Sequence, residues 1–161
     1  VLFHVLTEFG YSDLAFSMIT RPDYPSYGNW IARGATTLWE VFQPEGSDRI
    51  GSLNHHFWGD ISSWFTQALS GIRMAPHGEP NEVDFRPSFI SRLTHAEAFH
   101  IAPAGRIASA WERDEDDVIV LTVKLPSTMH GVIRLESGYV FEDDLAYKAA
   151  ESGTYRIHSI E

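Results

Sequence analysis

The fold is decided by residues 52–70, whose sequence is SLNHHFWGDISSWFTQALS. Apolar side chains recur there every three or four positions and gather on one side of a helical wheel, while serine, threonine and glutamine fill the other. This spacing predicts a long amphipathic helix over 52–70 that ends before Gly71. After Gly71 the pattern changes to short β-branched runs separated by turns, which predicts strands.

The segments before this helix are also helical in pattern. Residues 2–9 have helical spacing with Gly10 just past their end, and Ser12 is expected to cap a second helix. Two prolines then interrupt the pattern, so residues 21–34 are predicted to form an irregular loop. A further helix is expected to begin near Thr36 or Thr37 and to end at Pro44.

The second half of the chain reads as strands. Residues 106–113 and 118–125 are expected to pair as a hairpin across an acidic turn, and residues 132–135 and 154–160 alternate apolar with polar side chains. Helices followed by strands indicate an α+β chain of two units rather than alternating βαβ elements. We place the boundary at the Pro- and Gly-rich junction, which gives domains of residues 1–74 and 75–161.

Composition narrows the classes of function. The 161 residues are 43% hydrophobic, which is enough for a core, and they carry a net charge of −10. An acidic chain without a basic stripe repels phosphate backbones, so nucleic acid is not an expected partner. No apolar run approaches the roughly 20 residues that span a bilayer, so no membrane partner is expected either. The chain has no cysteine, which leaves its compartment open.

The candidate chemistry centres on Glu40 and His55. Both lie in aromatic-rich segments, and aromatic faces with an acid and a histidine suit a site that holds a sugar ring. A carboxylate flanked by loops could activate water, but glycoside hydrolysis normally needs a second carboxylate, which is not evident. The run Thr37-Leu38-Trp39-Glu40 also fits a helix capping box, in which Glu40 would be purely structural.

The adjacent histidines do not favour a metal site. His55 and His56 would project about 100° apart on a helix, so they could not easily grip one ion. His55 borders the apolar side of the predicted helix and is the better pocket candidate, although a purely structural histidine is the common alternative. Tyr27 lies in the proline-containing loop, where a pocket rim competes with a solvated loop.

The order of several short motifs resembles the bacterial α-L-rhamnosidases of glycoside hydrolase family 78. The motifs are YPSYG at 24–28, GATTLWE at 34–40, SLNH at 52–55 and GI at 71–72. The resemblance implies the terminal helices of an (α/α)6 barrel followed by a small antiparallel β-sandwich. It implies inverting hydrolysis of terminal, non-reducing α-L-rhamnose, with no cofactor and no metal. Glu40 matches the family's general base, and His55 its rhamnose pocket; we expect Trp39 and Tyr27 to contact the substrate as well.

The chain departs from the family pattern in two respects. Phe42 stands where many relatives carry a second tryptophan, and the family's general acid lies in earlier barrel segments that this sequence does not contain. We therefore expect the N-terminal part of the same barrel as a partner, a rhamnose-containing glycoside as substrate, and no activity from the chain alone. The alternatives are a non-catalytic carbohydrate-binding or interface module that uses aromatics such as Trp111, or an (α/α)6 hydrolase for another sugar.

Overall fold

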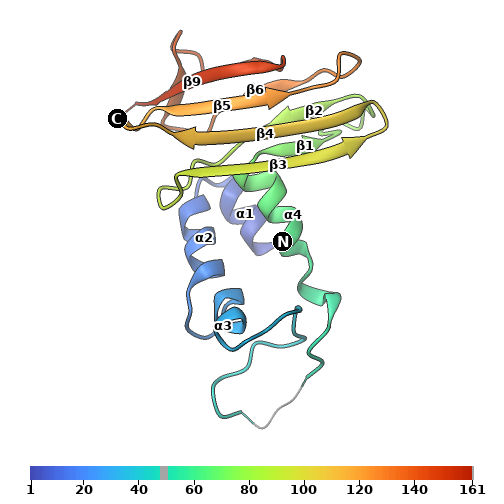
Figure 1. Ribbon diagram of the computed structural model, residues 1–161, viewed down its shortest axis with the longest axis vertical. Helices are drawn as coiled ribbons and strands as arrows, with labels where there is room; N and C mark the ends of the chain where they lie inside the picture. The colour runs from blue at the N-terminus through green and yellow to red at the C-terminus, as the bar shows by residue number, and fades with distance from the viewer. Residues whose placement is uncertain (48–50, 161) are drawn as a thin grey trace. The chain divides into compact units, whose positions relative to one another are not determined.

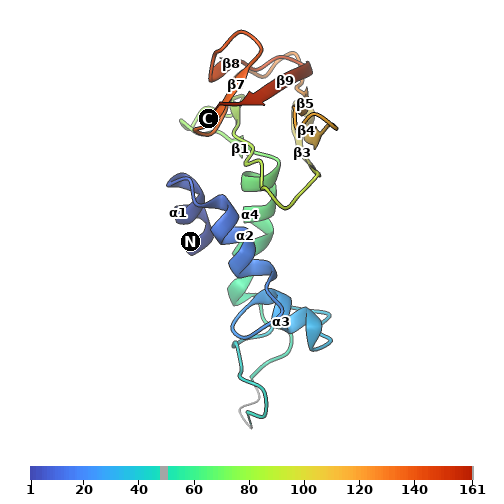
Figure 2. The same ribbon diagram turned by 90° about the vertical axis from the view of Figure 1, so that its left-hand side faces the viewer.

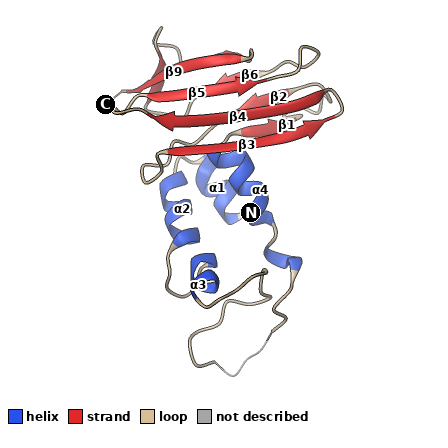
Figure 3. Ribbon diagram, viewed as in Figure 1, coloured by secondary structure: helices blue, strands red, loops and turns tan. Residues whose placement is uncertain are grey.

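The computed structural model describes residues 1–47 and 51–160 and divides into two compact units, Val1–Ser63 and Trp64–Glu161. Helices dominate the first unit and strands the second (Figure 3). The expected order of helices before strands is therefore confirmed. The domain boundary after residue 74 remains a prediction.

The first two predicted helices are present. Helix α1 spans Leu2–Glu8 and is followed by Gly10 at a φ of 81°, a left-handed conformation that glycine adopts without strain. Helix α2 spans Ser12–Thr20 and buries Ala15 and Ile19. Its N-cap residue is Tyr11, so the prediction that Ser12 caps this helix was wrong by one residue.

The predicted loop at 21–34 is wrong in part, because it contains helix α3, Tyr27–Ala32. Ser26 is extended and its hydroxyl oxygen accepts a hydrogen bond from the Asn29 N–H at 2.8 Å. This is an N-cap, which satisfies one of the free amides of the first turn. The prolines interrupt the chain where expected, but the cap restarts a helix immediately after them.

The helix predicted near residues 36–44 was wrong. The segment is a succession of bends and turns, and residues 38–40 run antiparallel to residues 52–55. Two backbone hydrogen bonds join these segments, from the Glu40 N–H to the Ser52 carbonyl at 2.9 Å and from the His55 N–H to the Leu38 carbonyl at 2.8 Å. Pairing across the intervening residues therefore outweighs the local helical pattern.

The long helix predicted over 52–70 starts later and is irregular. A 3₁₀ turn, η1, spans His56–Trp58, an α-helical segment, α4, spans Asp60–Trp64, and a π-helical segment, η2, spans Phe65–Leu69. The first four residues of the predicted helix are taken up by pairing with residues 38–40. Figure 2 labels α4 together with α1, α2 and α3. In the described part of the chain, no helix has the length and apolar character needed to cross a bilayer.

The second unit is a sandwich of two sheets. One has the strand order β1-β2-β6-β8 and the other β3-β4-β5-β9-β7. The strands are β1 Ile72–Met74, β2 Val83–Phe85, β3 His95–Ala102, β4 Gly105–Arg113, β5 Ile119–Lys124, β6 Val132–Arg134, β7 Tyr139–Phe141, β8 Tyr147–Ala149 and β9 Gly153–Ser159. Side chains from both sheets form one hydrophobic core, with Phe85 and Ile133 on one side and Trp111 and Leu121 on the other.

The hairpin predicted across the acidic turn is confirmed. Strands β4 and β5 pair antiparallel, with Arg113 opposite Ile119, and Asp117 in the turn has a φ of 61°. One oxygen of Asp114 accepts hydrogen bonds from the Asp116 and Val118 N–H groups at 3.0 and 2.9 Å. The turn is thus closed by a side chain that replaces missing backbone partners.

Trp111 is a core residue and not a surface aromatic. Only 2% of it is exposed, and its indole N–H donates to the Leu69 carbonyl at 2.7 Å. The suggestion that Trp111 could serve as a sugar-binding platform was therefore wrong. Its large ring fills space in the core between the two sheets.

Candidate active site

An aromatic cluster supports the motif residues in the helical unit. The Trp30 ring is buried and stacks on Phe42 with 4.3 Å between centroids and 16° between planes. Tyr27 packs edge-on against both rings, and Trp58 lies 5.2 Å from Phe42. Helix α3 is thereby tied to residues that follow the Trp-Glu motif in the sequence, with Phe42 at the centre of the cluster.

Backbone pairing brings the Trp-Glu motif and the Ser-Leu-Asn-His motif together. In addition to the two backbone bonds, the Ser52 N–H donates to Oε2 of Glu40 at 2.8 Å, and the Thr37 hydroxyl donates to the Leu53 carbonyl. Residues 38–40 and 52–55 therefore form a hydrogen-bonded pair of segments. Glu40 lies on the first segment and His55 on the second.

Glu40 is exposed and is held by Ser52 and Trp58. Ser52 binds one of its carboxylate oxygens, and the Trp58 indole N–H donates to its carbonyl at 2.9 Å. A Cβ atom on Gly51 would lie 3.3 Å from Oε2, so this glycine lets the carboxylate lie close to the backbone. The capping-box interpretation was wrong, because no helix begins at Thr37. The carboxylate instead stays open to solvent with one oxygen fixed.

His55 has an extended backbone, with φ −136° and ψ 131°, so the helical-wheel argument for its position was wrong. Its Nδ1 accepts a hydrogen bond from the Phe57 N–H at 3.2 Å. In the neutral ring this bond puts the proton on Nε2, where it can be donated. The His55 and His56 rings stack at 5.4 Å instead of diverging. Among residues 1–47 and 51–160 no group of three or more histidine and acidic side chains could hold a metal ion.

Tyr27 lies beside these paired segments, and Trp39 belongs to one of them. The Tyr27 hydroxyl donates to the Trp58 carbonyl at 3.1 Å. Burial, with a smaller contribution from the charge of Asp60, raises the pKa of Tyr27 to about 12, so the phenol stays protonated. Trp39 is half-buried, with the Arg33 guanidinium 5.3 Å from its ring centre. Tyr27 therefore fixes the backbone beside the site, and Trp39 offers an aromatic face at its edge.

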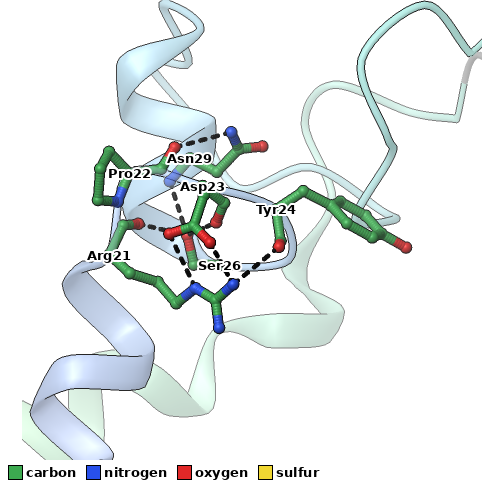
Figure 4. A network of polar contacts seen from close by, with 6 residues as sticks. All are labelled: Arg21, Pro22, Asp23, Tyr24, Ser26 and Asn29. Atoms are coloured by element: carbon green, nitrogen blue, oxygen red, sulfur yellow. Dashed lines mark hydrogen bonds and ion pairs between the residues drawn. The ribbon is translucent and has the colours of Figure 1, made fainter.

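The sequence did not point to Arg21 and Ser26, which order the loop before α3 (Figure 4). Arg21 forms a two-bonded ion pair with Asp23 and also donates to the Tyr24 carbonyl at 3.0 Å. The buried Ser26 hydroxyl lies 2.6 Å from the Arg21 carbonyl and 3.0 Å from that of Asp23. A serine directly before Tyr27, which with Trp30 and Ile31 has helical spacing, was the signal that could have indicated this cap.

Comparisons with known proteins agree with this architecture. Residues 1–69 match the bacterial alpha-L-rhamnosidase 6 hairpin glycosidase domain, and residues 81–139 match the bacterial alpha-L-rhamnosidase C-terminal domain. The helical unit is thus part of a six-hairpin glycosidase barrel, and the strands form the β-sandwich that follows it.

Four curated proteins that are similar to this chain are named alpha-L-rhamnosidase. An alpha-L-rhamnosidase of Alteromonas sp. (strain LOR) is 33% identical over 125 residues, which are 72% of this chain and 13% of that protein. One from Formosa agariphila is 32% identical over 134 residues, 80% of this chain and 14% of that protein. Among solved structures, the alpha-L-rhamnosidase of Dictyoglumus thermophilum has a TM-score of 0.80 and 26% identity, over 99% of this chain and 20% of that one.

A further structure of this kind is the Streptomyces avermitilis alpha-L-rhamnosidase complexed with L-rhamnose. It has a TM-score of 0.79 and 25% identity, over 97% of this chain and 17% of that one. The chain belongs to the bacterial α-L-rhamnosidase family. It spans about an eighth of the length of the curated relatives described above, and a fifth or less of the solved structures.

Proposed function

We propose that this chain supplies the general base of an inverting glycoside hydrolase that releases terminal, non-reducing α-L-rhamnose. The observation that carries the proposal is the pairing of residues 38–40 with 52–55, which joins the segments of Glu40 and His55 by hydrogen bonds. The two motifs that resemble the family's site are separated in sequence, and nothing in their local pattern would otherwise bring them together. The names of the similar proteins support the sugar.

In the proposed reaction Glu40 takes a proton from a water molecule as that water attacks the anomeric carbon. The bond from the anomeric carbon to the leaving oxygen breaks, and a separate carboxylic acid gives that oxygen its proton. An inverting enzyme places its two carboxyl groups about 6.5–9.5 Å apart, which leaves room for the water. Because the Ser52 N–H fixes one oxygen of Glu40, the carboxylate has one orientation in which to accept the proton.

The neighbouring side chains would hold the sugar. His55 can donate from Nε2 to a ring hydroxyl, since its Nδ1 is occupied by the Phe57 N–H. The exposed part of Trp39 can pack on the C–H face of the ring. Tyr27 contributes indirectly, because its hydroxyl binds the Trp58 carbonyl while the Trp58 indole N–H binds the Glu40 carbonyl.

The proposal assigns the general acid to a part of the barrel outside this sequence. Several large apolar side chains of the helical unit are exposed and would pack against that part: Leu2, Val5, Phe9, Leu14, Ile31, Leu53 and Phe57. The 161-residue chain alone should then lack rhamnosidase activity. Turnover of an aryl α-L-rhamnoside by the purified chain, above that of its Glu40→Gln variant, would contradict this assignment.

The test of the base is Glu40→Gln in a full-length protein that contains this chain. We expect kcat to fall by about 10²–10⁴, the usual contribution of general acid–base catalysis, with an unchanged circular dichroism spectrum. Glu45→Gln, a matched change at an exposed position in the following turn, should leave kcat as it is. Equal activities of the two variants would show that Glu40 is not the base.

The same protein can test the sugar and the stereochemistry. Proton NMR of the first product from an aryl α-L-rhamnoside should show the β-anomer before mutarotation. The α-anomer would disprove inversion. Turnover of another aryl glycoside in preference to the rhamnoside would keep Glu40 as the base and change only the substrate.

A further inference from the structure

The outer face of the five-stranded sheet carries an ordered array of side chains that the proposed active site does not use. Strands β3, β4 and β5 lie side by side (Figure 1), and their alternate residues point away from the core. In one row across the strands, His95 lies opposite Glu112, and Glu112 lies opposite Val120. In the next row, Glu97 lies opposite Ala110 and Ala110 lies opposite Thr122.

A hollow of about 340 Å³ lies between these rows, within the size range of small-ligand sites. Its lining comprises His95, Ala96, Glu97, Ala110, Trp111, Glu112, Val120 and Thr122. The small, half-buried Ala110 and Thr122 make its floor, and the exposed Glu97 and Glu112 rise from its walls. The hollow exists because small residues occupy the centre of the array and long ones its margins.

Polar and apolar groups continue the array beyond the hollow. The hydroxyl of Thr154 on β9 lies 3.3 Å from that of Thr122, which extends the row of Glu97 across a fourth strand. In the row on the other side, Phe99 is 55% exposed and the Arg106 guanidinium lies 4.0 Å from its ring centre. The face therefore offers hydroxyls, carboxylates and an aromatic side chain within three neighbouring rows.

The charges of this face are balanced, although the chain as a whole is strongly acidic. Glu97 and Glu112 are matched by Lys124 on β5 and Arg106 on β4, which lie on the same side by the alternation of the strands. Arg156 on β9 also lies on this side, and its charge is paired with Asp114 at 3.1 Å. A face without net charge has no electrostatic preference for a polycation or a polyanion. Mixed donors and acceptors around a small apolar floor suit a neutral molecule that carries hydroxyl groups.

We propose that this hollow is a second, non-catalytic site that binds a neutral oligosaccharide. Hydroxyl groups of the sugar would donate to Glu97 and Glu112 and accept from Thr122, while the C–H face of the ring lies on Ala110. The site is built only from strands of the second unit, so it stands whether or not Glu40 is a general base. It would keep a carbohydrate chain bound while the active site works on its end.

The test is affinity electrophoresis of the 161-residue chain in native gels that contain a soluble polysaccharide. The probes are neutral arabinoxylan, galactomannan and β-glucan, with anionic polygalacturonate as the charged counterpart. We expect at least one neutral polymer to slow the chain. Ala110→Trp should fill the hollow and weaken the retardation by about tenfold or more, whereas Ala146→Trp, the same change at an exposed position outside the array, should not.

Thr122→Val keeps the shape of the floor and removes one hydroxyl, so it should weaken the retardation several-fold without affecting folding. Near-ultraviolet circular dichroism reports whether each variant keeps its packed core. Absence of retardation by all three neutral polymers would overturn the proposal, as would Ala110→Trp behaving like the unmodified chain. Stronger retardation by polygalacturonate would also overturn it, since it would assign the face to anions.

Discussion

The two units differ in how completely they bury their own apolar side chains. The strand unit closes a core of buried residues contributed by both sheets, with Val83, Phe85 and Leu121 fully enclosed. In the helical unit, α1 buries none of its residues, and Phe9 and Phe57 are 76% and 68% exposed. A sandwich satisfies its hydrophobic faces within itself, whereas helices from a barrel need neighbouring helices to cover theirs.

This difference in burial predicts a difference in stability between the two units. The strand unit should be the more stable of the two, because it buries more of its apolar side chains. The helical unit is held by a smaller aromatic cluster around Trp30 and by polar contacts such as the Ser26 cap. The residues proposed for catalysis lie in this less completely buried unit.

The largest expected effect contrasts aromatic truncations in the two units. Trp111→Ala removes a fully enclosed ring and leaves the Leu69 carbonyl without its indole donor, so it should destabilise the chain by about 3–5 kcal/mol. Phe57→Ala removes a ring that is mostly exposed, and it should change the free energy of unfolding by about 0.5 kcal/mol or less. Urea unfolding followed by far-ultraviolet circular dichroism measures both.

Similar losses in the free energy of unfolding for Trp111→Ala and Phe57→Ala would contradict this difference between the units. In that case Phe57 would be buried in solution by some contact of the chain with itself or with a second copy. Repeating the measurement over a range of protein concentrations separates these causes, because only self-association makes the midpoint depend on concentration.

A smaller effect is expected from Ser26→Ala in the helical unit. The change removes the N-cap of α3 and the hydroxyl contacts to Arg21 and Asp23, and should cost about 1–2 kcal/mol. Ser137→Ala, at an exposed turn of the strand unit, is the matched control and should be nearly neutral. Amide hydrogen exchange in residues 27–32 checks whether the loss is local. Unchanged protection there would mean that packing of Trp30, and not the cap, holds the helix.

Elements with local signals were predictable from the sequence. The β4–β5 hairpin was predicted because a β-branched run, an acidic turn and a second strand are contiguous, and helix α1 because its spacing and Gly10 agree. The region 36–55 was not predictable in this way. Residues 38–40 pair through their backbone with residues 52–55, which are distant in the sequence, and a helical pattern in each segment hides that pairing.

In the candidate site, too, local motifs were predictable and contacts between distant residues were not. Glu40, His55, Trp39 and Tyr27 could be proposed from the order of the family's motifs, and their functional roles remain predictions. The hydrogen bonds that hold these residues in place could not be predicted. The Trp58 indole that binds the Glu40 carbonyl, and the Tyr27 hydroxyl that binds the Trp58 carbonyl, are contacts over 18 and 31 residues. No pattern within a single segment encodes such distant partners.

The smallest effect contrasts one carboxylate from each unit. The hydrogen-bonded Arg21 guanidinium lowers the pKa of Asp23 below its ordinary value of 3.8. Partial desolvation raises the pKa of Asp114, but the Val118 and Asp116 N–H groups and Arg156 together outweigh it, so this pKa is lowered as well. Both carboxylates therefore favour the folded state at pH values above 3.8, and this contribution disappears as the pH falls through their lowered pKa values.

Carbon-detected NMR titration of the two side chains can separate their supports. Arg21→Gln should return the pKa of Asp23 close to its ordinary value, because the arginine is the main cause of the shift. Arg156→Gln should raise the pKa of Asp114 only slightly, because both backbone N–H groups of the turn remain. If Arg156→Gln had the larger effect, the strand unit too would depend on exposed side chains for its local order, and the contrast between the units would not extend to their electrostatics.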